Sequence, residues 1–166
     1  MKESKKQLDN SSLPEPLAFI KAIHKKGVRY LLIGRQAVIA YGGPVQTMDY
    51  DIYVDGSEKN INHLLEIAIE FSLFPSIPKE EIAKTFKFKL ENDCVIDVFR
   101  AKHLMVSKTE KISFDEIYER KVVAKDVSGL EVNLPSIEDL ILLKKVRSSP
   151  KDLLDIEYLK QLKNKK

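Results

Sequence analysis

The sequence predicts one domain of the α/β (α+β) class, in which a mixed sheet is flanked by helices and followed by C-terminal helices. Its 166 residues correspond to about one domain and are enough to bury a hydrophobic core. Hydrophobic residues make up 43% of the chain and charged residues 32%, which is ordinary for a globular protein. The expected elements follow the order α-β-α-β-α-β-β-α-β-β-α-α, and this mixture of crossovers and hairpins indicates a mixed sheet.

Helices and strands alternate in the first half of the chain. An apolar face at helical spacing predicts a helix that ends at Gly27, and a buried strand then runs into Gly34. The following short helix ends at Gly42 and Gly43, because glycine readily adopts the left-handed conformation at a helix C-terminus. The elements expected in this half are helices over 13–27, 35–43 and 60–74 and strands over 28–34 and 48–54.

The second half is expected to contain two hairpins and three helices. Turn residues at Asn92-Asp93 and at Ser128-Gly129 separate strand-like segments and predict the hairpins. The last helix has a strong start signal, with Ser149 as its N-cap and a proline at its first position. The elements expected here are strands over 85–91 and 94–101, a hairpin over 121–135, and helices over 114–121, over 137–146 and from 150 onwards.

The composition excludes several kinds of protein. The single cysteine, Cys94, leaves no partner for an intrachain disulfide and fits a reducing compartment, so we expect a cytoplasmic protein. No membrane is expected, because the chain has neither a span-length apolar stretch nor an apolar signal region at its N-terminus. The net charge of +3 is too small to indicate nucleic-acid binding by itself. Residues 1–12 and 161–166 carry much of the excess of positive over negative charge and are expected to be flexible tails.

Two aspartates stand one residue apart in the second predicted strand. Side chains two positions apart on a strand point to the same side, so Asp49 and Asp51 project together while Tyr50 and Ile52 point the other way. Two neighbouring carboxylates repel each other, and one pKa rises unless they share a proton or bind a cation. Hard oxygen ligands favour magnesium or manganese. A solvated strand edge without a metal is the alternative for this pair.

A third aspartate, Asp97, interrupts the apolar segment CVIDVF, and a buried carboxylate needs a partner or a function. It is expected either to pair with Arg100 or Lys102 or to complete a two-metal site with the first two aspartates. In such a site one ion activates an attacking hydroxyl and the other neutralises a leaving phosphate. Gly34 adds a strand-to-helix turn, whose exposed backbone N–H groups are where a triphosphate is bound.

Together these features resemble the nucleotidyltransferases of the DNA polymerase β superfamily, in the minimal or abortive-infection form found in toxin–antitoxin systems. The resemblance spans residues 17–160 and rests on LLIGRQAVIAYGGPVQTMDYDIYV, on CVIDVF and on LPSIEDLILLKK. The residues of the first segment that match the family pattern are Ala37, Tyr41, Gly42, Thr47, Asp49 and Asp51. The resemblance implies a nucleotidyltransferase-like fold around a five-stranded mixed sheet.

The resemblance also implies an enzyme that uses a nucleoside triphosphate, with Mg²⁺ or Mn²⁺ as cofactor, to transfer a nucleotidyl group to an acceptor hydroxyl. The acceptor would belong to a tRNA end or to a partner toxin protein. Asp49, Asp51 and Asp97 would be the catalytic residues and metal ligands, with Asp97 helping to deprotonate the acceptor. The residues implied to bind the nucleotide are Gly34, Arg35, Thr47 and Lys144.

Two residues depart from the family pattern. Arg35 replaces the second glycine or serine of the signature, and Val45 replaces an arginine that precedes the Asp-x-Asp motif. Either the arginine has changed position and Arg35 binds the polyphosphate bidentately, or nucleotide binding has weakened. In the second case the chain is a catalytically weak or inactive nucleotidyltransferase fold that acts as a protein-binding antitoxin or regulatory module.

The charged residues near the C-terminus have a second interpretation. Lys144 also fits the solvated face of an amphipathic helix. Asp152 and Asp155 also fit a helix cap and a surface charge.

Overall fold

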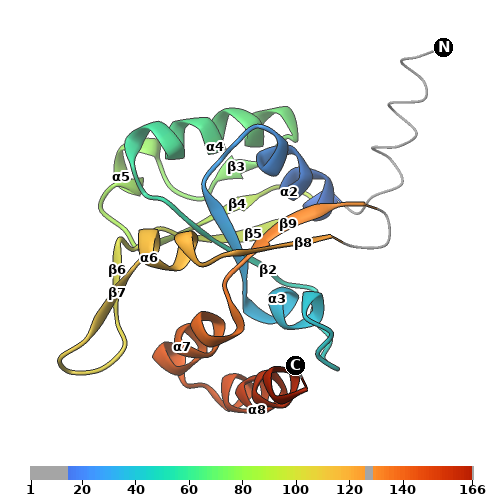
Figure 1. Ribbon diagram of the computed structural model, residues 1–166. Helices are drawn as coiled ribbons and strands as arrows, with labels where there is room; N and C mark the ends of the chain where they lie inside the picture. The colour runs from blue at the N-terminus through green and yellow to red at the C-terminus, as the bar shows by residue number, and fades with distance from the viewer. Residues whose placement is uncertain (1–14, 126–128, 166) are drawn as a thin grey trace.

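The computed structural model describes residues 15–125 and 129–165 (Figure 1). Its centre is a five-stranded sheet with the strand order β1-β2-β5-β4-β3. β2 and β5 run parallel, and the other neighbouring strands run antiparallel. This mixed sheet confirms the predicted fold class. Its strands are β1 (Tyr30–Ile33), β2 (Tyr50–Val54), β3 (Phe74–Pro75), β4 (Lys87–Glu91) and β5 (Val95–Phe99).

Helices surround this sheet, and the C-terminal pair lies below it in the view of Figure 1. The last helix continues to Asn164 and so includes most of the segment 161–166, whereas residues 1–12 lie outside the described part of the chain. No helix in the described ranges is long and apolar enough to cross a membrane. The helices are α2 (Glu15–Lys25), α3 (Gly34–Ala40), α4 (Glu58–Glu70), α5 (Lys79–Ile82), α6 (Phe114–Glu119), α7 (Ile137–Arg147) and α8 (Pro150–Asn164).

Two hairpins lie outside the central sheet. The hairpin of β8 (Val122–Lys125) and β9 (Glu131–Leu134) confirms the prediction over 121–135. Ser128 of the predicted turn lies outside the described residues. The hairpin of β6 (His103–Met105) and β7 (Lys111–Ser113) was not predicted, because its strands are too short to show an alternating pattern. It projects from the body beside α7 (Figure 1).

The boundaries of α4 differ from the predicted range of 60–74. The helix begins earlier because the hydroxyl of Ser57 accepts a hydrogen bond from the backbone N–H of Asn60. It ends at Glu70, and Ser72 then adopts a left-handed conformation with φ of 55°. The chain therefore changes direction at Ser72, two residues before the start of β3.

The strands present two different faces, because successive side chains point to opposite sides of a sheet. On the first face Ile52, Val54, Ile96 and Val98 are buried in one hydrophobic cluster with residues of α2 and α4. The second face carries a smaller cluster around Tyr53, together with residues of β7 and α6. Asp51 and Asp97 lie on this second face, since they alternate with the buried residues of β2 and β5.

Candidate active site

Asp51 and Asp97 lie directly opposite each other on neighbouring parallel strands. Burial, followed by repulsion from the Asp97 carboxylate, raises the pKa of Asp51 to about 6. Arg147 and Lys87 act on this pKa in the opposite direction. The sheet thus holds two acids together in a partly desolvated position, which is the arrangement that a bound cation would stabilise.

Lys87 is the basic residue that pairs with Asp97, with 3.7 Å between Nζ and Oδ1. The expected partner Arg100 instead donates to the backbone carbonyls of Ala83, Thr85 and Gly56. Sequence patterns missed Lys87 because it lies on the neighbouring antiparallel strand β4, and only the register between β4 and β5 brings it to Asp97.

Gly34 adopts a left-handed conformation, with φ of 68°, at the junction of β1 and α3. A Cβ atom at this position would collide with Oδ2 of Asp51. Two requirements therefore select glycine here, because other residues rarely adopt this φ and the carboxylate occupies the space of a side chain. The turn predicted from the apolar strand and its glycine packs directly on the predicted metal ligand.

Asp49 does not join the other two aspartates. It lies just before β2 and is exposed, and its backbone N–H donates to the hydroxyl of Thr47 at 3.1 Å. Among the described residues, no three His, Cys, Asp or Glu side chains are placed to hold one metal ion. The structure therefore brings Asp51 and Asp97 together, and the metal and nucleotide roles assigned to Asp49 and Thr47 stay predictions.

The carboxylate pair fits a hard divalent cation. Oδ1 of Asp97 is buried and accepts no hydrogen bond within the described part of the chain. The Lys87 ammonium approaches it, but at 3.7 Å the contact is longer than a hydrogen bond. A buried carboxylate oxygen without a hydrogen bond, beside a second carboxylate, is suited to a magnesium or manganese ion.

Arg35 does not project into open space beside the turn. Its Nε lies 3.3 Å from Oδ2 of Asp155, and its Nη2 lies 3.3 Å from Oδ1. The guanidinium also donates to the backbone carbonyl of Gln46 at 3.4 Å. Arg35 therefore connects the start of α3 to α8 and to the loop before β2.

Lys144 is only 3% exposed, so the interpretation that places it on a solvated helix face is wrong. Its Nζ lies 2.9 Å from Asp155 and 3.6 Å from Asp152. Both aspartates are completely buried, so the interpretation of Asp155 as a surface charge is wrong as well. The expected capping role of Asp152 is confirmed, because it forms a capping box with Ser149.

Arg147 is a site residue that sequence patterns missed. It forms two hydrogen bonds with Asp152, at 2.7 and 2.8 Å. Burial acts to raise the pKa of Asp152, but hydrogen bonds from Arg147 and Ser149 outweigh it and hold this pKa well below its usual range. In the sequence Arg147 follows two lysines at the end of α7 and therefore resembles an ordinary basic helix terminus. Only the packing of α7 on α8 identifies it as a site residue.

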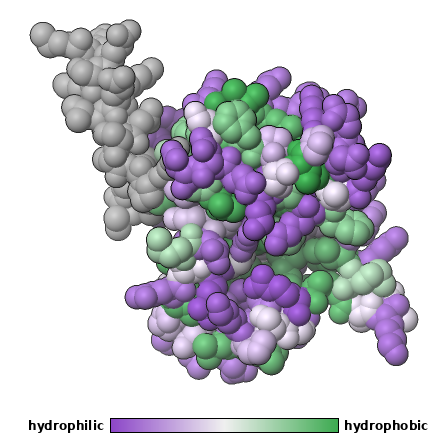
Figure 2. All heavy atoms as spheres, turned by 180° about the vertical axis from the view of Figure 1, so that it is seen from behind, coloured by the Kyte–Doolittle hydropathy of each residue, from purple (hydrophilic) through white to green (hydrophobic). Residues whose placement is uncertain are grey.

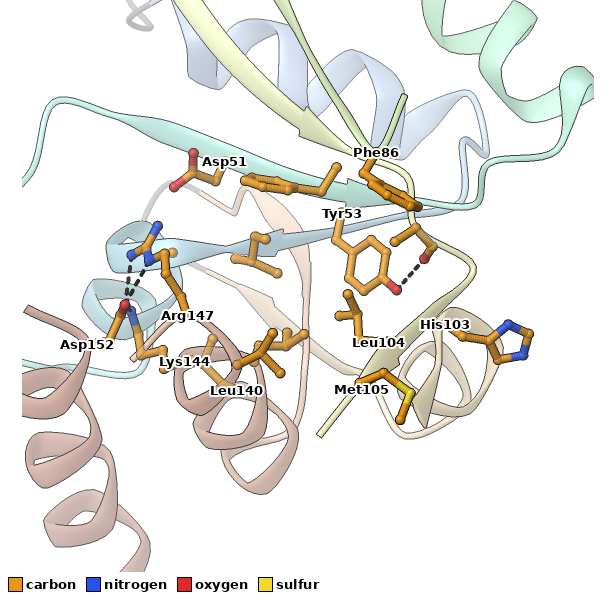
Figure 3. A pocket seen from close by; sticks show the side chains of 16 residues that line it. Asp51, Tyr53, Phe86, His103, Leu104, Met105, Leu140, Lys144, Arg147 and Asp152 are labelled. Atoms are coloured by element: carbon orange, nitrogen blue, oxygen red, sulfur yellow. Dashed lines mark hydrogen bonds and ion pairs between the residues drawn. The ribbon is translucent and has the colours of Figure 1, made fainter. Parts of the chain in front are cut away.

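Four of the charged residues line one end of a cavity of about 400 Å³. Asp51, Lys144, Arg147 and Asp152 gather at this end, and Tyr53, Leu104 and Met105 lie toward the other (Figure 3). From behind, apolar surface extends between the body of the molecule and the projecting hairpin (Figure 2). The cavity lies between the second face of the sheet, α7 and the β6–β7 hairpin.

No known family model and no curated protein sequence matches this chain. Solved structures do. The lincosamide antibiotic adenylyltransferase LnuA, with lincomycin bound, is 14% identical, and the match has a TM-score of 0.62 and covers 89% of this chain and 96% of that one. ANT(2")-Ia in complex with adenylyl-2"-tobramycin is 14% identical, with a TM-score of 0.57 and coverage of 85% and 83%.

The chain has a nucleotidyltransferase fold. This agrees with the fold that the sequence motifs implied, and the match extends over most of both chains. At such low identity the likeness concerns the fold, and function must be inferred from the site itself.

Proposed function

We propose that this protein is a metal-dependent nucleotidyltransferase that transfers a nucleotidyl group from a nucleoside triphosphate to an acceptor hydroxyl. The observation that supports this most is the pair Asp51 and Asp97, opposite each other on parallel strands and packed against the turn at Gly34. The fold that surrounds this pair is one that carries adenylyl transfer in other proteins.

In the proposed reaction the acceptor oxygen forms a bond to the α-phosphorus. The bond between that phosphorus and the oxygen leading to the β-phosphate breaks, and pyrophosphate leaves with its electron pair. The proton of the acceptor hydroxyl passes to a carboxylate, and Asp97 is the proposed recipient. Asp51 lies opposite Asp97 on the neighbouring parallel strand, so the register of the sheet fixes the spacing between the two carboxylates.

Magnesium or manganese would be held by Asp51 and Asp97, with Asp49 as a further proposed ligand from the loop before β2. When bound, the metal supplies charge neutralisation at the carboxylates and at the leaving phosphates. We assign the nucleotide to Gly34, Arg35, Thr47 and Lys144, and we add Arg147 because it lines the same cavity end as Asp51.

Lys144 and Arg147 lie at the same end of the cavity as Asp51. Arg35, Lys144 and Arg147 face the buried carboxylates of Asp152 and Asp155, and once Asp51 is included the charges of this cluster balance. Arginine and lysine hold phosphate through charge-assisted hydrogen bonds, and a divalent cation would add the positive charge that an anionic triphosphate needs.

We further propose that the protein belongs to the minimal or abortive-infection type of toxin–antitoxin systems and acts in the cytoplasm. A tRNA end and a hydroxyl side chain of a partner toxin are the macromolecular acceptors that this assignment suggests. Both follow from the motif resemblance over residues 31–54.

The proposal is tested by melting experiments with ATP, GTP, CTP and UTP, each with and without Mg²⁺. At least one triphosphate should raise the melting temperature of the wild type only when Mg²⁺ is present, and Asp51→Asn should abolish this increase. Incubation of each labelled triphosphate with cell extract then shows which class of molecule becomes labelled. If no triphosphate stabilises the protein and Asp51→Asn changes nothing, the chain is a binding module without this chemistry.

A further inference from the structure

We propose that the cavity beside Asp51 is the acceptor subsite, and that its acceptor is a small, largely apolar molecule with a hydroxyl group. The chemical step of this inference rests on the proposed function. The binding step does not, because a cavity can be tested with a ligand that never reacts.

The size of the cavity suits a small molecule. Its volume of about 400 Å³ falls in the range of ordinary small-molecule sites, which span about 300–1,000 Å³. It is bounded on three sides, by the sheet, by α7 and by the β6–β7 hairpin. A tRNA end or a folded partner would have to enter between these walls, whereas a small molecule fits inside them.

The walls are mainly apolar. The sheet contributes Tyr53 and Phe99, and the residue just before β4 contributes Phe86. α7 and the β6–β7 hairpin form the remaining walls. The apolar residues on these two elements are Leu140, Leu143, Val146, Leu104 and Met105.

The end of the cavity away from Asp51 offers few groups that bind polar ligands. The hydroxyl of Tyr53 already donates to the carbonyl of Ala101, a contact drawn in Figure 3. His103 also lines this end. A sugar-rich or polycationic acceptor would lose its water here without gaining new hydrogen bonds, which is costly. An apolar ring system or chain would lose few hydrogen bonds to water on entering this end.

Two apolar side chains at the rim of the cavity are exposed to solvent. Phe86 is 76% exposed and Met105 is 57% exposed, although both line the cavity. Phe86 immediately precedes β4, and continuing the alternation of that strand would bury it beside Phe88. Instead it borders this opening. An apolar ligand would cover both residues, and covering exposed apolar surface is favourable.

The polarity of the cavity also sets the orientation of the ligand. A hydroxyl attached to an apolar body would be directed to the end that holds Asp51, since the other end has few partners for it. There it would meet Asp51, which lies opposite Asp97, the proposed acceptor of its proton. The nucleobase of the triphosphate is the competing occupant, and the experiment must separate the two.

The first measurement is the binding of N-phenyl-1-naphthylamine, a neutral dye that becomes fluorescent in apolar sites, to the full chain. We expect saturable binding that weakens at least tenfold in Phe86→Lys and Met105→Lys. Both substitutions affect exposed side chains, so the variants should fold. Phe74→Lys and Ile69→Lys are the matched controls, because these apolar residues are also exposed but lie outside the cavity. Equal dye binding in all four variants would overturn the inference.

The second measurement adds Mg·ATP to the complex with the dye. Retained or tightened dye binding supports an acceptor subsite, whereas competitive displacement by ATP would show that the cavity holds the nucleotide and would overturn the inference. The third measurement offers the wild type labelled triphosphates together with apolar alcohols and phenols, and separately with RNA and protein.

The label should enter the apolar alcohols, and Phe86→Lys should raise the KM for them far more than the KM for the triphosphate. Labelling of RNA or protein alone would overturn the acceptor class while leaving the proposed function standing. If the dye binds but no triphosphate binds or reacts, the proposed function fails, and the acceptor role fails with it.

Discussion

Arg35 and Asp155 are joined by two contacts of 3.3 Å each, so the residue that follows Gly34 is tied to the last helix. The position that the motif reserves for glycine or serine therefore carries a structural cation. As a phosphate ligand, Arg35 would have to share its guanidinium with Asp155. The interpretation of Arg35 as a sign of a decayed site is not needed to explain its presence.

This contact predicts that substitutions of Asp155 and Arg35 lower the free energy of unfolding by very different amounts. Asp155→Asn should lower the free energy of unfolding by about 3–5 kcal/mol, because it removes a completely buried counter-charge from Arg35 and Lys144. Arg35→Gln should cost only about 1 kcal/mol, because Lys144 still neutralises Asp155 and the Arg35 side chain is partly exposed. Urea unfolding at pH 7 measures both values. A larger loss for Arg35→Gln would contradict the placement of Lys144 in the cluster.

The close packing of Gly34 on Asp51 predicts a loss of ligand binding on adding a single methyl group. Gly34→Ala should weaken the stabilisation by Mg²⁺ and triphosphate at least tenfold, because the new Cβ displaces the carboxylate. Gly27→Ala is the control, since Gly27 has φ of 78° but open space where a Cβ would lie. It should cost about 1 kcal/mol of stability through backbone strain and leave ligand binding unchanged. Equal ligand affinities in the two variants would contradict the role of this contact.

The raised pKa of Asp51 predicts an unusual pH dependence of stability without metal. Because the folded state holds this proton more tightly than the unfolded chain, ionisation of Asp51 destabilises the protein as pH rises from about 4 to about 6. Asp51→Asn should therefore be more stable than the wild type at pH 7, by about 1–2 kcal/mol after allowance for solvent screening. The difference should disappear below about pH 4.

Asp49→Asn is the matched control for this measurement, because Asp49 is an exposed member of the same motif. Its stability should follow that of the wild type across the pH range. Chemical unfolding at pH 4, 5, 6 and 7 in the presence of EDTA provides the comparison. A wild type that gains stability relative to Asp51→Asn over this range would show that Asp51 is not destabilised by its neighbours.

Addition of Mg²⁺ should make the wild type more stable than Asp51→Asn. A cation between Asp51 and Asp97 binds only the folded state, so saturation to about 100 times the Kd adds about 2.7 kcal/mol to the stability of the wild type. Asp51→Asn and Asp97→Asn should each lose most of this gain. Na⁺ at matched ionic strength separates metal binding from charge screening. An equal increase in all three proteins would indicate screening alone.

Much of the site was predictable because its signals are local. The apolar strand that ends at Gly34, the alternation around Asp51 and the polar interruption at Asp97 can each be read from a few neighbouring residues. The same holds for the cap at Ser149 and for most helices, since capping and periodicity depend on residues that are close in the chain.

Other features depended on residues far apart in the sequence. The buried state of Lys144 and Asp155 and the role of Arg147 follow from the packing of α7 on α8. A helical pattern shows which residues share a face, but it does not show what that face contacts. For this reason the charges near the C-terminus were divided wrongly between surface and interior.

By itself the sequence determined the order of most helices and strands, the glycine turn, and Asp51 and Asp97 as two of the three carboxylates that it assigned to one site. Only the tertiary structure decided that Asp51 lies opposite Asp97, that Arg35 is bound by Asp155, and that an apolar cavity opens beside them. The physical reason is that strand register and helix packing are set by contacts between distant segments. Short patterns along the chain carry little information about such contacts.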